Sequence, residues 1–96
     1  MRITITTDSN PVAWGPDCDE ETAQAAATRL ADMLADYARE MWPEAEVETA
    51  TRRYMEGETT LLVGVSDYTD ETTYTQVCTE VGRQAEMIWT DALEGV

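Results

Sequence analysis

The segment that decides the fold covers residues 17–51 and reads DCDEETAQAAATRLADMLADYAREMWPEAEVETAT. Asp17 followed three residues later by Glu20 has the form of a helix N-cap with a capping-box partner. Pro43 predicts a helix end near Trp42, because the residue before a proline is disfavoured in the α region. Between these signals, apolar residues at helical spacing predict a buried stripe through about five turns. This stripe consists of Ala23, Ala26, Ala27, Leu30, Met33, Leu34, Tyr37 and Met41.

The end of the same segment changes from helical spacing to strict alternation, which is typical of a strand. One face of this expected strand carries Ala45, Val47 and Thr49, and the other carries Glu44, Glu46 and Glu48. Residues 55–58 (MEGE) supply a turn, and residues 59–65 (TTLLVGV) form the most apolar strand of the chain. We therefore expect these two strands to pair as a hairpin.

The remaining elements flank this centre. Ile3 and Ile5 alternate with polar residues, which predicts a half-buried strand, and the Pro, Gly and Asn residues of positions 8–16 predict a loop. Residues 67–71 form a loop and helix entry, after which a second helix is expected to end near Gly95. Its predicted apolar stripe consists of Tyr74, Val77, Cys78, Val81, Ala85, Ile88 and Ala92.

These elements predict one α+β domain over residues 1–96, in the order β-α-β-β-α. The expected sheet has three strands, antiparallel or mixed, and both helices pack on one face of it. With ferredoxin-like connections, the first strand is an edge strand beside the third. An open edge of this kind allows dimerisation or strand addition by a partner.

The charge excludes several function classes. Twenty carboxylates face six arginines, giving a net charge of −14, and the chain has no Lys and no His. The usual general bases, Schiff-base lysines and imidazole metal ligands are therefore missing, so we expect no enzyme, no metal site and no cofactor. So negative a surface repels nucleic acid and anionic membranes, and its natural partners are proteins with basic surfaces. The start resembles no signal peptide and no segment is long and apolar enough to span a membrane, which predicts a soluble, cytoplasmic protein.

Two local features have a simple structural interpretation. The acidic stretches 17–21 and 67–71 do not match the calcium-loop pattern, and both are explained as helix starts that favour acids. Cys78 lies on an apolar stripe, and Cys18 has no neighbouring base to activate it. The two cysteines form no CxxC pair, so we expect free thiols.

The solvent side of the first helix has carboxylates at i, i+4 and i+8, namely Asp32, Asp36 and Glu40. Like charges at this spacing destabilise a helix, so helix stability does not explain them. They repeat about every 6 Å along the helix axis, against about 3.4 Å per charge along one DNA strand. A second acidic row would be needed to imitate DNA. The predicted partner-binding residues are Asp32, Asp36, Glu40, Glu44, Glu46, Glu48, Glu56 and Glu58.

The opening MRITITTD, the lack of Lys, the capped helices and the large negative charge resemble small accessory proteins of phages from high-GC hosts. In size and charge the chain is similar to anti-CRISPR inhibitors that act as DNA mimics. The resemblance implies an inhibitor, present in the host cytoplasm, that occupies the basic nucleic-acid-binding channel of a defence or DNA-processing complex.

Two alternatives follow from the same residues. A small phage adaptor or assembly protein would bind through the strand edge or through its aromatic residues, namely Trp14, Trp42, Tyr54 and Tyr68. A salt-adapted acidic domain would need no partner. Salt adaptation distributes carboxylates over all faces, whereas mimicry gathers them on one face and leaves the arginines elsewhere.

Overall fold

The computed structural model describes residues 1–15, 18–53, 61–68 and 70–95. It confirms an α+β architecture with a mixed three-stranded sheet. A short helix, α1, lies within the segment expected to be a loop. The elements in chain order are β1 (Arg2–Asp8), α1 (Pro11–Trp14), α2 (Glu20–Met41), β2 (Glu46–Arg52), β3 (Leu61–Ser66) and α3 (Glu71–Glu94).

The sheet has the order β2-β1-β3, so β1 is its central strand. β2 pairs with β1 in parallel, from Arg2 opposite Glu46 to Asp8 opposite Arg52, and β3 pairs with β1 antiparallel. The predicted hairpin between the second and third strands is therefore wrong, as is the edge position of the first strand. The physical reason is the α2 crossover, which returns the chain beside β1 in the same direction, as β-α-β units do.

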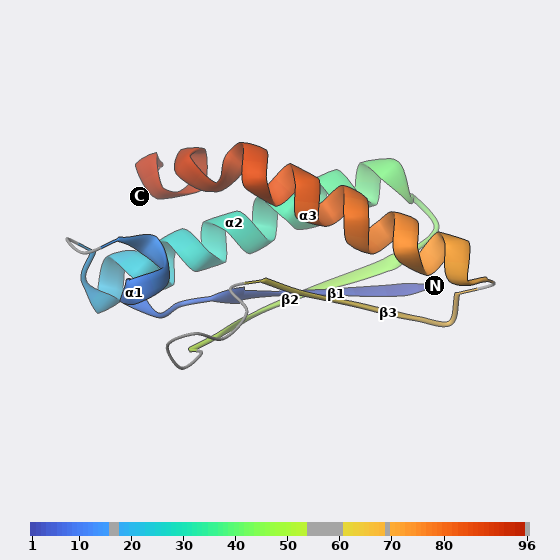
Figure 1. Ribbon diagram of the computed structural model, residues 1–96, viewed down its shortest axis with the longest axis horizontal. Coiled ribbons are helices and arrows are strands. Elements are labelled where there is room, and N and C mark those ends of the chain that lie inside the picture. The colour runs from blue at the N-terminus through green and yellow to red at the C-terminus, as the bar shows by residue number, and fades with distance from the viewer. Residues whose placement is uncertain (16–17, 54–60, 69, 96) are drawn as a thin grey trace.

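The core lies between the sheet and the two long helices, which Figure 1 shows above the sheet. Ile3 and Ile5 have no exposed surface and form the floor of this core. The helices close it with Ala23, Ala26, Ala27, Leu30, Leu34 and Ala38 from α2 and Val77, Val81, Ala85 and Ala92 from α3. Burial of these side chains removes the apolar surface that drives folding.

The alanines and leucines of the α2 stripe are buried as their spacing predicts, but the methionines and the tyrosine are not. Met33 and Tyr37 are half-buried, and Met41 is 45% exposed. Trp42 caps the C-terminal end of the helix, and its N–H donates to the Ala38 oxygen over 2.8 Å. Met41 is therefore the last residue of the helix.

Helix α3 begins within the predicted entry region, because the Asp70 carboxylate accepts the Thr73 N–H over 2.7 Å. Val77, Val81, Ala85 and Ala92 of its predicted stripe are buried, but three other members are less buried than predicted. Tyr74 is 39% exposed, and Cys78 and Ile88 are half-buried.

Helix α1 is fixed to the core by Trp14. The Trp14 ring stacks on Trp89 of α3 with centroids 4.2 Å apart, and its Nε1–H donates to the Asp8 oxygen over 2.7 Å. The chain reverses here through Asn10, which caps α1 by accepting the Val12 N–H. These contacts connect the end of β1 to α3.

Candidate binding surface

The predicted carboxylate row lies on the outer side of α2. Asp32, Asp36 and Glu40 are all exposed, and the helix buries its opposite face against the core. The row covers about 12 Å of helix axis. Arg39 forms one ion pair with this row, in which its guanidinium nitrogen lies 3.3 Å from a carboxylate oxygen of Asp36. The Asp36 side chain is 81% exposed. Among the described residues no ion pair involves Asp32 or Glu40.

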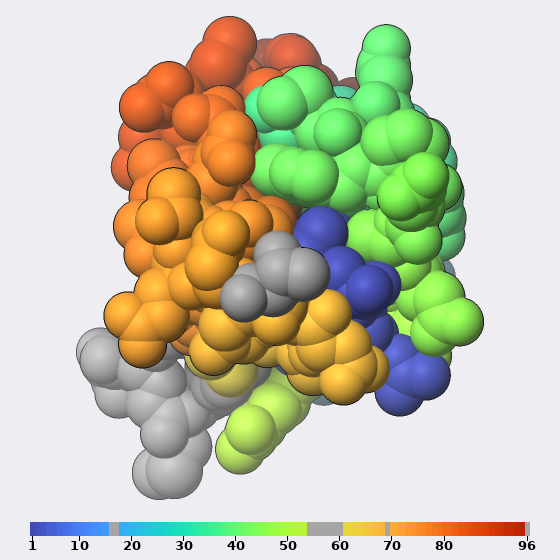
Figure 2. All heavy atoms as spheres, turned by 90° about the vertical axis from the view of Figure 1, so that its right-hand side faces the viewer, coloured from blue at the N-terminus to red at the C-terminus, as the bar shows by residue number. Residues whose placement is uncertain are grey.

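The exposed Glu44 continues this row into the turn between α2 and β2. This turn is held by backbone hydrogen bonds. The Ala45 N–H donates to the Trp42 oxygen over 3.0 Å, and the Glu46 N–H donates to the Met1 oxygen over 2.9 Å. The turn is therefore held beside the N-terminus, at the end of the domain that Figure 2 shows.

Glu46 and Glu48 lie on the other side of the molecule. Their β1 partners are Arg2 and Thr4, which point away from the buried Ile3 because side chains alternate along a strand. Arg2 lies between the two carboxylates, 3.2 Å from Glu46 and 3.9 Å from Glu48. Hydrogen bonding to Glu46, and then the charge of Glu48, raise the pKa of the Arg2 guanidinium.

The eight predicted residues therefore do not form one face. Asp32, Asp36 and Glu40 are on the helix side, Glu44 is at the connecting turn, and the β2 pair is on the sheet side. Glu56 and Glu58 lie outside the described residues. The rows predicted on α2 and β2 are on opposite faces of a two-layer domain.

Other acids add to both layers. Glu86, Asp91 and Glu94 are exposed on α3, in its C-terminal half, where the helix dipole does not favour negative charge. Several arginines lie among the carboxylates, including the pairs Arg53–Glu20 and Arg83–Glu80. The acidity is thus distributed around the molecule, with arginines between the acids. This is the distribution expected of salt adaptation, and it contradicts a mimic that gathers its carboxylates on a single face.

The acidic stretches at the helix starts serve as caps. Asp19, rather than the predicted Asp17, is the N-cap of α2 and accepts the Thr22 N–H over 2.7 Å; Asp17 lies outside the described residues. Hydrogen bonds from Thr22 to Asp19, and from Thr73 to Asp70, lower the pKa of each aspartate. Across residues 1–15, 18–53, 61–68 and 70–95, no group of three or more acids or cysteines is arranged to hold a metal ion.

Both cysteines are free and half-buried. Burial and, to a smaller extent, the Asp19 carboxylate raise the pKa of the Cys18 thiol. A raised pKa keeps a thiol protonated and weakly nucleophilic. The Cys18 environment therefore does not activate a thiolate. The thiol of Cys78, a residue of α3, lies 3.9 Å from the backbone oxygen of Val63 on β3.

The aromatic residues considered as interface anchors have different positions. Trp14 is 5% exposed and belongs to the core. Trp42 is half-buried and contacts Tyr37 edge to face, with centroids 6.4 Å apart. Tyr68 is 40% exposed beside Tyr74, and Tyr54 lies outside the described residues.

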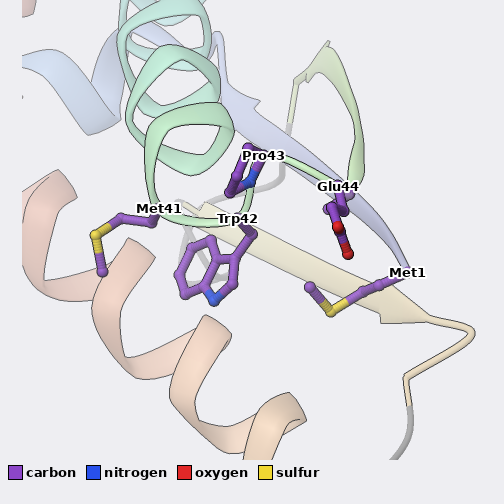
Figure 3. A pocket seen from close by; sticks show the side chains of 6 residues that line it. Met1, Met41, Trp42, Pro43 and Glu44 are labelled. Carbon is purple, nitrogen blue, oxygen red and sulfur yellow. The ribbon is translucent and has the colours of Figure 1, made fainter.

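An apolar pocket that the sequence did not predict lies where the α2 row ends (Figure 3). It has a volume of about 360 Å³ and is lined by Met1, Met41, Trp42, Pro43, Glu44 and Ala45. Helical spacing assigned Met41 to the buried stripe, which concealed it as a surface residue. The sequence nevertheless contains a signal for this pocket. Met41 and Trp42 directly precede Pro43, which ends the helix, so both stand at the helix end and not in the middle of the stripe.

Comparisons with protein-family models, characterised proteins and solved structures gave no match to this chain. None of the described helices is long and apolar enough to cross a membrane.

Proposed function

We propose that this protein is a non-catalytic acidic inhibitor that occupies the basic nucleic-acid-binding channel of a partner protein, such as a defence or DNA-processing complex. The observation that carries the proposal is the density of charge along the molecule. The chain has about one net negative charge for every 3 Å of its 42 Å length, against about 3.4 Å per charge along one DNA strand and 1.7 Å along the duplex.

The shape supports the same function. The cross-section of 25 × 19 Å is comparable with the width of a DNA double helix, and a duplex also presents negative charge on opposite sides. Carboxylates on both layers suit a channel that surrounds nucleic acid better than they suit a flat basic patch. The α2 row and Glu44 would contact arginine and lysine side chains on one wall of such a channel.

The β2 side would contribute less to binding. Arg2 already neutralises part of the charge of Glu46 and Glu48, and their partner would have to displace it. On the α2 side, Arg39 pairs with Asp36 and Arg29 lines the same surface hollow as Asp32 and Asp36. Among the described residues, however, no ion pair involves Asp32, Glu40 or Glu44. We therefore assign the main contact to Asp32, Asp36, Glu40 and Glu44.

The test is capture followed by competition. The protein is immobilised and exposed to nuclease-treated host lysate at low salt, and the bound proteins are eluted with a short DNA duplex. We expect elution by DNA of proteins with basic channels, and loss of binding at moderate salt because exposed charge pairs are screened. Capture of proteins that salt releases but DNA does not would contradict the proposal.

A second candidate function, an adaptor that binds an extended strand, is favoured by the edge of β3. This strand reads LLVGVS and has no charged residue. The other edge, β2, is protected because Arg39 donates to the Val47 oxygen over 3.4 Å, and charged side chains discourage strand addition. Partner binding through β3 would be insensitive to salt and would be lost on Val63→Pro, which removes a backbone donor.

A further inference from the structure

The pocket at the α2–β2 turn combines adaptable and rigid walls. Met1 and Met41 supply flexible thioether side chains, which fit irregular partners well. Figure 3 shows the Trp42 indole between them, with the Glu44 carboxylate on the Met1 side. The Trp42 ring is held edge to face against Tyr37, so it forms a rigid wall.

The backbone beneath the pocket is also fixed. The hydrogen bonds of Trp42 to Ala38, Ala45 to Trp42 and Glu46 to Met1 measure 2.8, 3.0 and 2.9 Å. A preformed pocket avoids part of the entropy cost of binding. Its volume of about 360 Å³ is at the small end of the range for ligand pockets, which suits one large side chain.

The surroundings of the pocket define the chemistry of its occupant. Glu44 lines it, and Glu40 is exposed in the last turn of the helix that leads to it. Carboxylates around an apolar pocket complement a segment in which an apolar side chain is flanked by Lys or Arg. Two copies of a chain with a net charge of −14 repel each other, which disfavours a second copy as the occupant.

We propose that this pocket receives one large apolar side chain from a basic segment of the protein partner, and so acts as the anchor of the complex. This inference rests on the proposed function. Charge along α2 would bring the two proteins together, and burial of the anchor would slow dissociation, since electrostatics mainly affects association.

The test uses two capped synthetic peptides, KRKLKRK and KRKAKRK, titrated into the intact protein and measured by calorimetry and by amide chemical shifts. Burial of most of a leucine side chain should make the first peptide bind about tenfold more tightly. The largest shifts should be those of Met41, Trp42 and Ala45. Both affinities should fall with salt.

Two variants separate the pocket from the surface charge. Met41→Ser should reduce the difference between the peptides to less than about threefold. The matched control Met87→Ser, which changes a 70% exposed methionine on α3, should keep it. Glu40→Gln with Glu44→Gln should weaken both peptides and leave their ratio unchanged.

The other outcomes are distinguishable. Equal, salt-dependent binding of both peptides would overturn the anchor while leaving the proposed function intact, and no binding of either would overturn both. Shifts confined to another surface, such as β3, would reject the pocket as the site. Self-association at working concentration that Met41→Ser abolishes would identify a second copy as the occupant instead.

Discussion

Neutralising the α2 row by Asp32→Asn, Asp36→Asn and Glu40→Gln should leave the fold intact and slightly stabilise it. The change removes two like-charge i,i+4 pairs, each unfavourable by about 0.2–0.5 kcal/mol. It also removes the 3.3 Å pair of Asp36 with Arg39, an exposed i,i+3 contact worth about 0.3–0.5 kcal/mol. The net gain is about 0.5 kcal/mol or less, measured by urea unfolding at low salt, and it should vanish near 1 M salt, where charges are screened within about 3 Å.

The same variant should bind the partner less tightly. An exposed charge pair contributes about 0.2–1 kcal/mol, so three lost pairs cost about 0.6–3 kcal/mol, or roughly a 3- to 150-fold rise in Kd. The assay is surface plasmon resonance against a partner identified by capture, at several salt concentrations. The dependence of affinity on salt should become shallower, because fewer charges meet in the complex.

The matched control is the triple variant Glu86→Gln, Asp91→Asn and Glu94→Gln on α3. It changes the net charge by the same amount, from −14 to −11, but at another exposed surface. A local binding row requires a larger loss for the α2 variant than for the α3 variant. Equal losses would show a general effect of net charge, and unchanged affinity in the α2 variant would reduce the row to a solvated face.

Two further predictions concern folding. Trp14→Phe removes the donor that bonds the Asp8 oxygen over 2.7 Å, and should lower the unfolding free energy in urea by about 1–3 kcal/mol without changing partner affinity; a selective loss of affinity would restore Trp14 as an interface anchor. The N-cap aspartates Asp19 and Asp70 have lowered pKa values in the folded state, so their stabilisation is present above their ordinary pKa of about 3.9 and is lost as pH falls through the folded value. The melting temperature of Asp19→Ala should therefore lie below that of the unmodified chain at pH 7 and converge with it in acid, and a constant difference across this range would contradict the assignment.

The sequence could predict the elements better than their arrangement. Pro43 determines where α2 ends, and local hydrogen bonding at Asp70 determines where α3 begins, so both signals are readable without tertiary structure. The pairing of strands is not local. The alternation of Ile3 and Ile5 fits an edge strand and a central strand equally well, and only the α2 crossover makes β1 central.

The candidate site was predictable only in part, for the same reason. Alternation correctly separates Glu46 and Glu48 from Val47, and helical spacing correctly exposes Asp32 and Asp36. Which side of the domain each set occupies depends on the packing of α2 on the sheet, which neither pattern contains.

The positions of the arginines decide which acidic surface is available to a partner. Arg2 lies between the carboxylates of Glu46 and Glu48, so the sheet face is partly neutralised by its own chain. Arg39 extends from α2 to the β2 edge, where it donates a hydrogen bond to the Val47 oxygen. It therefore satisfies a backbone acceptor of β2 and also pairs with the Asp36 carboxylate. On α2, Arg29 lies beside Asp32 and Asp36. Glu40 and Glu44 form no ion pair among the described residues, so the least neutralised part of this acidic surface is the end of α2 at the turn. Because the apolar pocket lies at the end of this surface, long-range attraction and short-range burial would act on the same segment of a partner.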